Sequence, residues 1–239
     1  MGIVKIGRVR LGHPTRIVGV VTGQKSLKKL KEIKKNGAEI IELRVDQLRS
    51  HKPEYIKAII DNIKQTGIPV IGTIRHTEWR KKYGVHAEEK RLDCFSKIIF
   101  SVDAVDIEHE SNKIRDKVIS FAKKHNKTVI YSYHNFFKLP APAVLDRICT
   151  RFRSSGADIL KLAVTVNSLE DAFEFMIYVK KLSKLSHVIG IGMGEAGKFT
   201  RIYGGLFGSC ITYAYIDRKV VPGQLPLRGL KKKIEGIYS

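Results

Sequence analysis

The sequence predicts an α/β fold, a (β/α)8 barrel in which eight parallel strands form a closed sheet with helices around it. Two observations predict this fold: short apolar segments recur along the chain, and segments with helical periodicity separate them. The spacing between successive apolar segments suits βαβ units and is too long for hairpins. The eight expected strands are residues 17–22, 39–44, 69–74, 104–108, 128–132, 158–163, 187–192 and 207–213.

Helical periodicity is clear in residues 26–36, 54–64, 114–124 and 168–182. In the second of these segments Ile56, Ile59 and Ile63 recur on one face, as the buried side of an amphipathic helix requires. In the last segment the same period relates Leu169, Phe173, Met176, Ile177 and Leu182. Glycines stand where several of these helices would end, namely at Gly37, Gly67 and Gly156.

Residues 3–12 precede the first expected strand and indicate a small β-hairpin. Val4, Ile6, Val9 and Leu11 alternate around Gly7, so we expect this hairpin to plug the bottom of the barrel. The chain has no low-complexity linker, which predicts a single TIM-barrel domain over residues 1–239. A doubly wound open sheet is the alternative, but residues 22–25 lack the glycine-rich phosphate turn that usually follows its first strand.

The composition indicates an ordinary globular protein of the cytoplasm. Of the 239 residues, 43% are hydrophobic and 28% are charged, which excludes disordered, collagen-like and disulfide-rich classes. No apolar segment approaches the roughly 20 residues that span a bilayer, and the first residues lack a signal-peptide core. Cys94, Cys149 and Cys210 form no Cys-x-x-Cys pair, so we expect no zinc site and a reducing compartment.

The chain is strongly basic, with 44 Lys and Arg residues, 23 Asp and Glu residues and a formal net charge of +21. Many of the lysines fall within residues 25–35, where Leu27, Leu30 and Ile33 form the opposite, apolar face of a helix. This pattern favours a solvated surface over a nucleic-acid footprint, and no helix-turn-helix, RNP or zinc-finger spacing indicates a nucleic-acid partner. A positive field would also attract a small anionic substrate.

Charged and titratable residues recur on the inward face of five neighbouring strands, near their carboxyl ends. Alternation along each strand directs the following side chains toward the barrel axis: Glu42, Arg44, Asp46, Arg75, Asp106, Glu108, Ser132, His134 and Lys161. Active sites of (β/α)8 barrels lie at that end, and folding alone gives no reason to bury so many charges. A structural ion network among Glu42, Arg44 and Arg75 is the alternative.

Lys161 and His134, on neighbouring strands, predict carbonyl chemistry. Because apolar residues flank Lys161 and Arg44 or Arg75 lies nearby, we expect the pKa of its amine to be lowered. A neutral amine attacks carbonyl groups to form a Schiff base, and an imidazole with a reference pKa of about 6.5 moves protons near neutrality. The alternatives are a core histidine and a lysine that extends to the rim.

The chain resembles the type I 3-dehydroquinate dehydratase family from residue 17 to about residue 230. The resemblance rests on an ordered set of motifs: Glu42-Leu43-Arg44-Val45-Asp46, Thr73-Ile74-Arg75, Ser132-Tyr133-His134-Asn135-Phe136, Lys161-Leu162-Ala163-Val164, Met193, Thr200-Arg201, Phe207-Gly208-Ser209 and Pro222-Gly223-Gln224. It implies a hydro-lyase that converts 3-dehydroquinate to 3-dehydroshikimate in the shikimate pathway of aromatic amino-acid biosynthesis. It further implies that no cofactor or metal is used and that the protein is a homodimer.

The resemblance also implies roles for individual residues. Lys161 would form an iminium with the C3 ketone, and His134 would take the C2 proton and return a proton to the departing C1 hydroxyl. Arg201 would hold the substrate carboxylate, and Gln224 would close over it on a loop that Gly223 makes flexible. The remaining substrate contacts are expected from Glu42, Arg44, Arg75, Met193 and Tyr213.

The sequence departs from the family pattern at three places. The serine sometimes found at the end of the first strand has no clear match among Gly19, Val20 and Val21. Trp79 stands four residues after Arg75, where the family often has Glu, and the nearest acid is Glu78. Val220 and Val221 stand where Ser or Ala is common, which removes a hydroxyl contact near Gln224.

Two other functions remain open from the sequence. A class I aldolase would use the same lysine chemistry, and Gly190, Gly192, Gly194 and Gly197 are a faint version of the phosphate-binding loop it needs. A basic barrel that binds RNA or acidic partners without catalysis would explain the net charge but not the inward lysine and histidine.

Overall fold

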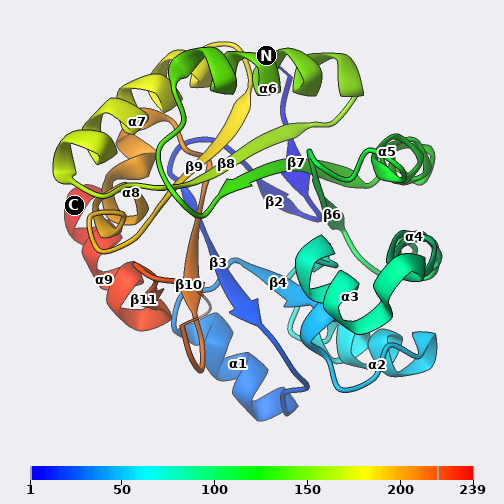
Figure 1. The fold of residues 1–239 in the computed structure, drawn as a ribbon. Coiled ribbons are helices and arrows are strands. Elements are labelled where there is room, and N and C mark those ends of the chain that lie inside the picture. The colour runs from blue at the N-terminus through cyan, green and yellow to red at the C-terminus, as the bar shows by residue number, and fades with distance from the viewer. Residues whose placement is uncertain (1, 220, 239) are drawn as a thin grey trace.

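A computed structural model describes residues 2–219 and 221–238, and it confirms the predicted barrel (Figure 1). The barrel strands are β3 (Arg16–Val21), β4 (Ile40–Arg44), β5 (Val70–Thr73), β6 (Ala104–Glu108), β7 (Thr128–Asn135), β8 (Ile159–Thr165), β9 (His187–Met193) and β10 (Ile211–Tyr215). The helices outside them are α1 (Leu27–Lys35), α2 (Pro53–Lys64), α3 (His76–Tyr83), α4 (Ala87–Ile98), α5 (Arg115–Lys124), α6 (Pro142–Ser155), α7 (Leu169–Ser183), α8 (Lys198–Tyr203) and α9 (Leu227–Tyr238). None of the described helices is long and apolar enough to cross a membrane.

The predicted boundaries hold to within three residues for seven of the barrel strands and fail for the eighth. That strand was expected at 207–213, but the 3-10 helix η3 (Gly204–Phe207) occupies its beginning. Gly208 then has φ of 87°, a left-handed conformation that cannot continue a strand. The strand therefore begins only at Ile211.

The barrel closes between β9 and β10 with little backbone pairing. The ladder runs from the short strand β11 (Leu225–Pro226) through β10 and β3 to β9. Among the described residues, a single bridge between Val188 and Ser209 joins β9 to the segment before β10. Side chains replace the missing ladder: the amide of Gly190 donates to Ser209 Oγ at 3.0 Å, and the amide of Gly192 donates to Thr200 Oγ1 at 2.7 Å. The Thr200 and Ser209 hydroxyls thus satisfy strand amides that no neighbouring strand reaches.

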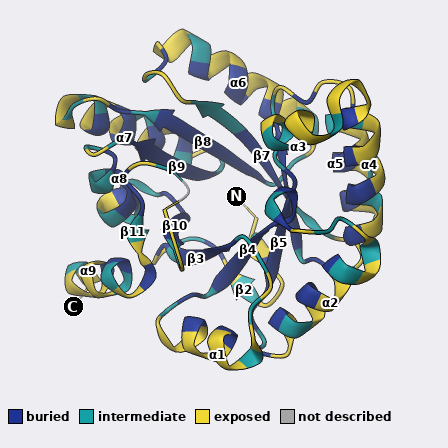
Figure 2. Ribbon diagram, turned by 60° about the horizontal axis from the view of Figure 1, so that its bottom comes forward, coloured by how far each residue is buried: buried dark blue, intermediate teal, exposed yellow. Residues whose placement is uncertain are grey.

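Two apolar layers hold the barrel together. Figure 2 shows the strands largely buried and the surrounding helices buried on one side and exposed on the other. The outer layer lies between strands and helices and includes Ile41, Leu43 and Leu162. The inner layer lies inside the barrel and includes residues near the amino ends of the strands, among them Ile71 and Ile159. Apolar residues thus fill the bottom of the barrel, which leaves the carboxyl ends for polar side chains.

The amino-terminal hairpin packs on the inner layer, as predicted. It consists of β1 (Lys5–Ile6) and β2 (Val9–Arg10), which pair antiparallel. Ile6 is fully buried and Leu11 is 5% exposed, and both belong to the apolar cluster inside the barrel. The hairpin therefore covers the end of the barrel opposite the polar side chains.

Helix α7 has a second apolar face that the sequence pattern did not separate from the first. Met176 and Leu182 are buried against the barrel, but Leu169, Phe173 and Ile177 are 55%, 46% and 52% exposed. These three residues, spaced four apart, form an exposed stripe along the helix. Phe173 also packs against Phe199 of α8, with ring centroids 4.5 Å apart.

The buried position of Ile6 predicts that the hairpin stabilises the barrel. Ile6→Ala should lower the free energy of unfolding by about 2–5 kcal/mol, because it leaves a cavity in the inner apolar layer. Ile3→Ala is the matched control, since Ile3 is 59% exposed. Urea denaturation measures both variants, and equal small losses would show that the hairpin does not seal the barrel.

Candidate active site

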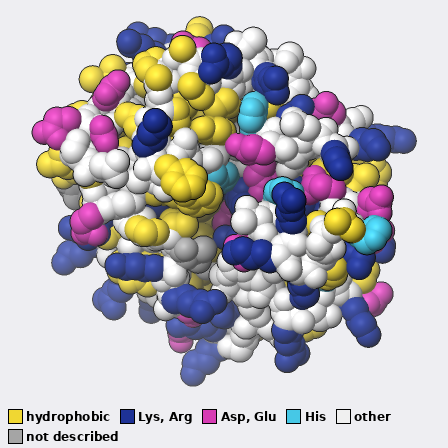
Figure 3. Space-filling model, viewed as in Figure 1, with side chains coloured by type: hydrophobic (Ala, Val, Ile, Leu, Met, Phe, Trp, Pro, Cys, Tyr) yellow, Lys and Arg dark blue, Asp and Glu magenta, His cyan; other side chains and the backbone are white. Residues whose placement is uncertain are grey.

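The predicted site residues meet in one cavity of about 290 Å³ at the carboxyl ends of the strands. All nine line it: Lys161, His134, Glu42, Arg44, Arg75, Arg201, Gln224, Met193 and Tyr213. Figure 3 looks onto this end of the barrel, where histidine and charged side chains border a hollow near the centre of the face.

The Lys161 amine lies among carboxylates, which reverses one expectation from the sequence. Its Nζ donates to Asp106 Oδ2 at 2.8 Å, stands 3.6 Å from Glu42 Oε1 and lies 4.2 Å from the centre of the Tyr213 ring. Burial lowers the pKa of this amine, but the Asp106 carboxylate, with Tyr213 and Glu42, raises it further, so the net shift is upward. The predicted lowering was wrong, and Lys161 is an ammonium ion in the free protein.

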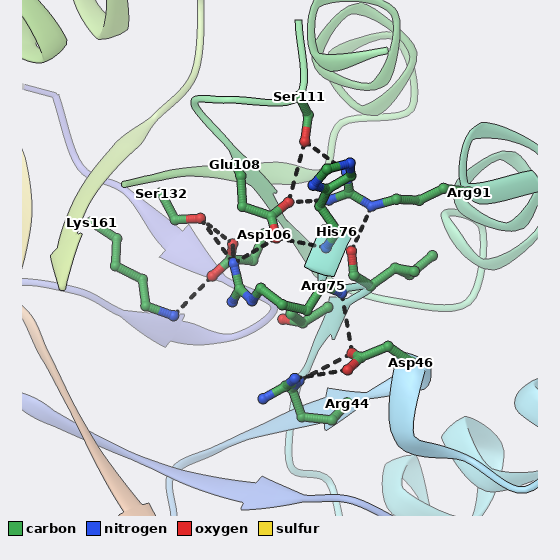
Figure 4. Close-up of polar contacts among 12 residues, drawn as sticks. Arg44, Asp46, Arg75, His76, Arg91, Asp106, Glu108, Ser111, Ser132 and Lys161 are labelled. Carbon is green, nitrogen blue, oxygen red and sulfur yellow. Dashed lines mark hydrogen bonds and ion pairs between the residues drawn. The ribbon is translucent and has the colours of Figure 1, made fainter. Parts of the chain in front are cut away.

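Asp106 is the residue that the sequence placed inside the barrel without assigning it to the site. Besides Lys161, it accepts a hydrogen bond from Ser132 Oγ at 2.6 Å and lies 3.4 Å from Arg75 Nη1 (Figure 4). Burial raises the pKa of its carboxyl, but the Lys161 and Arg75 cations lower it far more. Asp106 is therefore ionised throughout the neutral range, and the inward direction of β6 was the signal for it.

His134 is a neutral base at the edge of the same cavity. It pairs in register with Ala163 of β8, beside Lys161, and its ring stacks on Phe136 with centroids 5.9 Å apart. Burial lowers the pKa of the imidazole well below its usual value, and the Arg75 and Lys161 cations lower it further. Its Nδ1 has no hydrogen-bond partner in the described part of the chain, so this nitrogen can interact with a ligand.

Arg201 is a buried cation that no carboxylate of the described residues pairs. It lies on α8, is 1% exposed, and its Nε and Nη2 atoms have no hydrogen-bond partner within residues 2–219 and 221–238. Burial lowers the pKa of its guanidinium to about 10, so it remains charged at neutral pH. Of the three arginines that line the cavity, Arg44 and Arg75 pair with carboxylates, whereas Arg201 has no carboxylate partner among the described residues. An unpaired buried charge is costly, and a bound anion would remove that cost.

The alternative interpretation, an ion network among Glu42, Arg44 and Arg75, does not match the contacts of these three residues. Arg44 instead makes two hydrogen bonds to Asp46, at 3.0 and 2.7 Å, in the 3-10 helix η1 (Val45–Gln47). Arg75 interacts with Asp106 and with Glu108 on β6. Glu42 accepts from Thr73 Oγ1 at 2.9 Å and faces Lys161. The three residues are therefore held separately around the cavity.

The loop after β10 covers one side of the cavity. Val221 and Gln224 line it, and the Gln224 side chain accepts from the Val221 amide at 3.3 Å. Gly223 has φ of 80°, and a Cβ there would collide with the carbonyl oxygen of Gly194. Close approach of two loops thus requires this glycine. Val220 lies outside the described residues.

Helix α3 supplies lining residues that the prediction did not assign. Thr77 and Glu78 line the cavity, and so do Gln47 and Phe136 from other elements. Trp79 faces the other way, is buried, and stacks on His51 with centroids 4.3 Å apart. Glu78, rather than the position of Trp79, therefore brings an acid to the cavity.

Sequence comparison agrees with the geometry. Residues 17–238 match the family described as type I 3-dehydroquinase. The chain belongs to this family. A protein of Methanosarcina acetivorans named 3-dehydroquinate dehydratase is 36% identical over 244 residues, which cover 98% of this chain and 99% of that protein.

Solved structures of family members share the fold. The 3-dehydroquinate dehydratase from Aquifex aeolicus VF5 is 30% identical, with a TM-score of 0.82 over 94% of this chain and 99% of that one. The type I enzyme from Clostridium difficile, solved with covalently modified comenic acid, has a TM-score of 0.86 at 24% identity, over 99% of this chain and 97% of that one. The family consists of hydro-lyases of the shikimate pathway, and its barrel is the one described above.

The unpaired guanidinium predicts opposite stability effects for two arginines of the cavity. Arg201→Met should raise the free energy of unfolding by about 1–3 kcal/mol, because it removes a buried charge that has no partner. Arg44→Met should lower it by about 3–5 kcal/mol, because it leaves the fully buried Asp46 carboxylate without its cation. Denaturant titration of the free protein measures both, and a destabilised Arg201→Met protein would contradict the assignment.

Proposed function

We propose that the protein is a type I 3-dehydroquinate dehydratase, which converts 3-dehydroquinate to 3-dehydroshikimate through a lysine imine. The observation that carries the proposal is the unpaired Arg201 guanidinium in the same cavity as Lys161 and His134. The substrate is a small carboxylate with a ring ketone and several hydroxyls. The names of the protein's relatives and its family match support 3-dehydroquinate as the substrate over other ketones.

The cavity offers each part of the substrate a complementary group. The carboxylate pairs with Arg201 by charge-assisted hydrogen bonds, with Gln224 on the loop above it. Glu42, Arg44 and Arg75 bind ring hydroxyls. Met193 and the ring of Tyr213 are both buried in the cavity wall and contact the carbon skeleton.

Imine formation keeps the positive charge where the protein stabilises it. Lys161 first gives up one proton and attacks the C3 carbonyl. This proton and one from the attacking amine leave with the carbonyl oxygen as water, and the iminium nitrogen that remains is again cationic. The Asp106 and Glu42 carboxylates, which stabilise the ammonium ion, stabilise this iminium as well. They disfavour the free amine, but they favour the intermediate whose electron-withdrawing nitrogen acidifies C2.

His134 carries the protons of the elimination. Because its imidazole is neutral in the free protein, it can accept the C2 proton as the iminium becomes an enamine. The enamine then expels the C1 hydroxyl, and the imidazolium returns the proton to it, so that water leaves. Hydrolysis of the conjugated imine releases the product and restores the Lys161 ammonium ion.

The glycines near α8 argue against the aldolase alternative. A Cβ on Gly190 would contact Val179 at 2.5 Å, and a Cβ on Gly192 would contact Thr200 at 2.9 Å. Packing of helices α7 and α8 on β9 therefore explains these two glycines. A phosphate-binding loop would leave its glycine backbone open to the ligand instead.

We also propose one domain, a cytoplasmic location and a homodimer for this protein. One sheet from Arg16 to Pro226 and the match over residues 17–238 support a single domain. The three cysteines are buried and unpaired, as suits a reducing compartment. The exposed stripe of Leu169, Phe173 and Ile177 on α7 supports self-association, because soluble monomers rarely expose contiguous apolar patches.

The imine mechanism predicts different defects for its two principal residues. Lys161→Ala should lower kcat by about 10⁴-fold or more and abolish trapping by borohydride, because no imine can form. His134→Ala should lower kcat by about 10²–10⁴-fold while still being trapped, because the amine remains. Ultraviolet absorbance of the conjugated product measures turnover, and intact-protein mass spectrometry measures trapping.

Lys198→Ala is the matched control, since Lys198 is a surface lysine of α8 that pairs with Glu195. It should keep wild-type turnover and trapping. A borohydride-trapped adduct on the Lys161→Ala protein, or the absence of such an adduct on the His134→Ala protein, would overturn the assigned roles. Absence of product absorbance with the wild-type protein would overturn the substrate.

The stripe on α7 predicts that charge there disrupts the homodimer. Phe173→Asp should shift the protein toward the monomer in sedimentation equilibrium, because it places a charge in an apolar interface. Val85→Asp is the control at another exposed apolar residue, 95% exposed in the 3-10 helix η2 (Gly84–His86). A wild-type protein that stays monomeric at micromolar concentration would refute the dimer.

A further inference from the structure

Arg91, on helix α4, is a fully buried arginine outside the cavity wall. Its Nε donates to the carbonyl oxygen of Ile74 at 2.6 Å, and its Nη1 donates to Ser111 Oγ at 2.6 Å and to Glu88 at 3.3 Å. Its Nη2 pairs with Glu108 Oε2. Arginine is almost never fully buried unless it is paired, and all three of its nitrogens are engaged here.

Glu108 is held between Arg91 and the cavity. Its Oε1 accepts from Arg75 Nη1 and from the backbone amide of His76, both at 3.0 Å, while its Oε2 faces Arg91. Glu108 itself does not line the cavity. Its effect on the site therefore passes through the Arg75 guanidinium.

A single nitrogen of Arg75 is shared between two carboxylates. Arg75 Nη1 lies 3.0 Å from Glu108 and 3.4 Å from Asp106, and the opposite oxygen of Asp106 holds Lys161 at 2.8 Å (Figure 4). The result is a buried series of alternating charges: Arg91, Glu108, Arg75, Asp106 and Lys161. A stronger ion pair between Glu108 and Arg75 therefore weakens the ion pair between Arg75 and Asp106.

We propose that Arg91 is a positioning residue: it satisfies Glu108, leaves Arg75 shared with Asp106, and thereby limits how tightly Asp106 holds the Lys161 ammonium ion. Without Arg91, Glu108 attracts Arg75 more strongly, and Asp106 is left with Lys161 as its principal cation. Loss of the Arg91 charge itself acts in the same direction. The proton is then harder to remove from Lys161, and the free amine is rarer.

Removal of the Glu108 charge should have the opposite effect. In Glu108→Gln, Arg75 turns fully to Asp106 and competes with Lys161 for that carboxylate. The other groups that face Lys161 stay in place: Glu42 on β4, His134 on β7 and Tyr213 on β10. A residue that merely supports the fold would not give opposite changes for the two ends of one ion pair.

Competitive labelling of lysines tests this directly. Acetic anhydride acylates a neutral amine but not an ammonium ion. With a limiting amount of reagent at pH 9, the labelling rate of Lys161 relative to that of the exposed Lys113 therefore reports the fraction of Lys161 that is neutral. Peptide mass spectrometry measures both rates. Arg91→Met should lower this rate about threefold or more, and Glu108→Gln should raise it by a similar factor, since a pKa shift of one unit is tenfold. Arg91→Lys should stay near wild type because it keeps the charge.

The double variant Arg91→Met/Glu108→Gln should return toward the wild-type rate, because it removes both charges of the pair. Circular dichroism shows whether each variant folds. If Arg91→Met alone does not fold, the double variant and Glu108→Gln still test the proposal. Changes of the same sign in the folded variants, or no change in Glu108→Gln, would overturn the proposal.

The proposal rests on the proposed function only for its consequence in catalysis. Labelling reports the protonation of Lys161 whether or not the protein turns over 3-dehydroquinate. Failure of the dehydration assay with opposite labelling changes would thus reject the substrate and keep the role of Arg91. Product formation with unchanged labelling would do the reverse.

Discussion

The contact between the Lys161 amine and the Asp106 carboxylate governs the polar end of this barrel. A cation and an anion 2.8 Å apart in a buried site must each be satisfied further, and their neighbours are arranged accordingly. Ser132 and Arg75 complete Asp106, while Glu42 and the Tyr213 ring complete Lys161. Arg75 in turn pairs with Glu108, so the charges nearest this pair compensate one another, whereas Arg201 is left without a carboxylate partner among the described residues.

The same pair resolves an apparent conflict in the chemistry. A lysine nucleophile is usually explained by a lowered pKa, and here the pKa is raised by carboxylates. An iminium carries the charge of the ammonium ion at nearly the same place, so the carboxylates that slow the first step stabilise the product of that step. His134, kept neutral by burial and by neighbouring cations, then meets a substrate whose C2 proton is already acidified.

Much of this arrangement follows from alternation along the strands, and the rest depends on distances that a sequence does not contain. The inward direction of Lys161, His134 and Asp106 was predictable, because side chains alternate in a strand. The direction of the pKa shift of Lys161 was not predictable, since arginines and carboxylates both point inward. Arg91 gave no signal, because the charged residues around it in α4 are typical of a solvated helix. The eighth strand began late because of the left-handed Gly208.

The weak seam between β9 and β10 gives the ligand a place in the architecture of the barrel. Hydroxyl groups of Thr200 and Ser209, rather than a strand ladder, join the two sides there. Arg201 follows Thr200 on the helix that bridges this seam, and Lys161 stands on β8, on the near side of it. A substrate bound to both Lys161 and Arg201 would therefore connect the two sides of this seam, and its binding would add to the stability of the closed barrel.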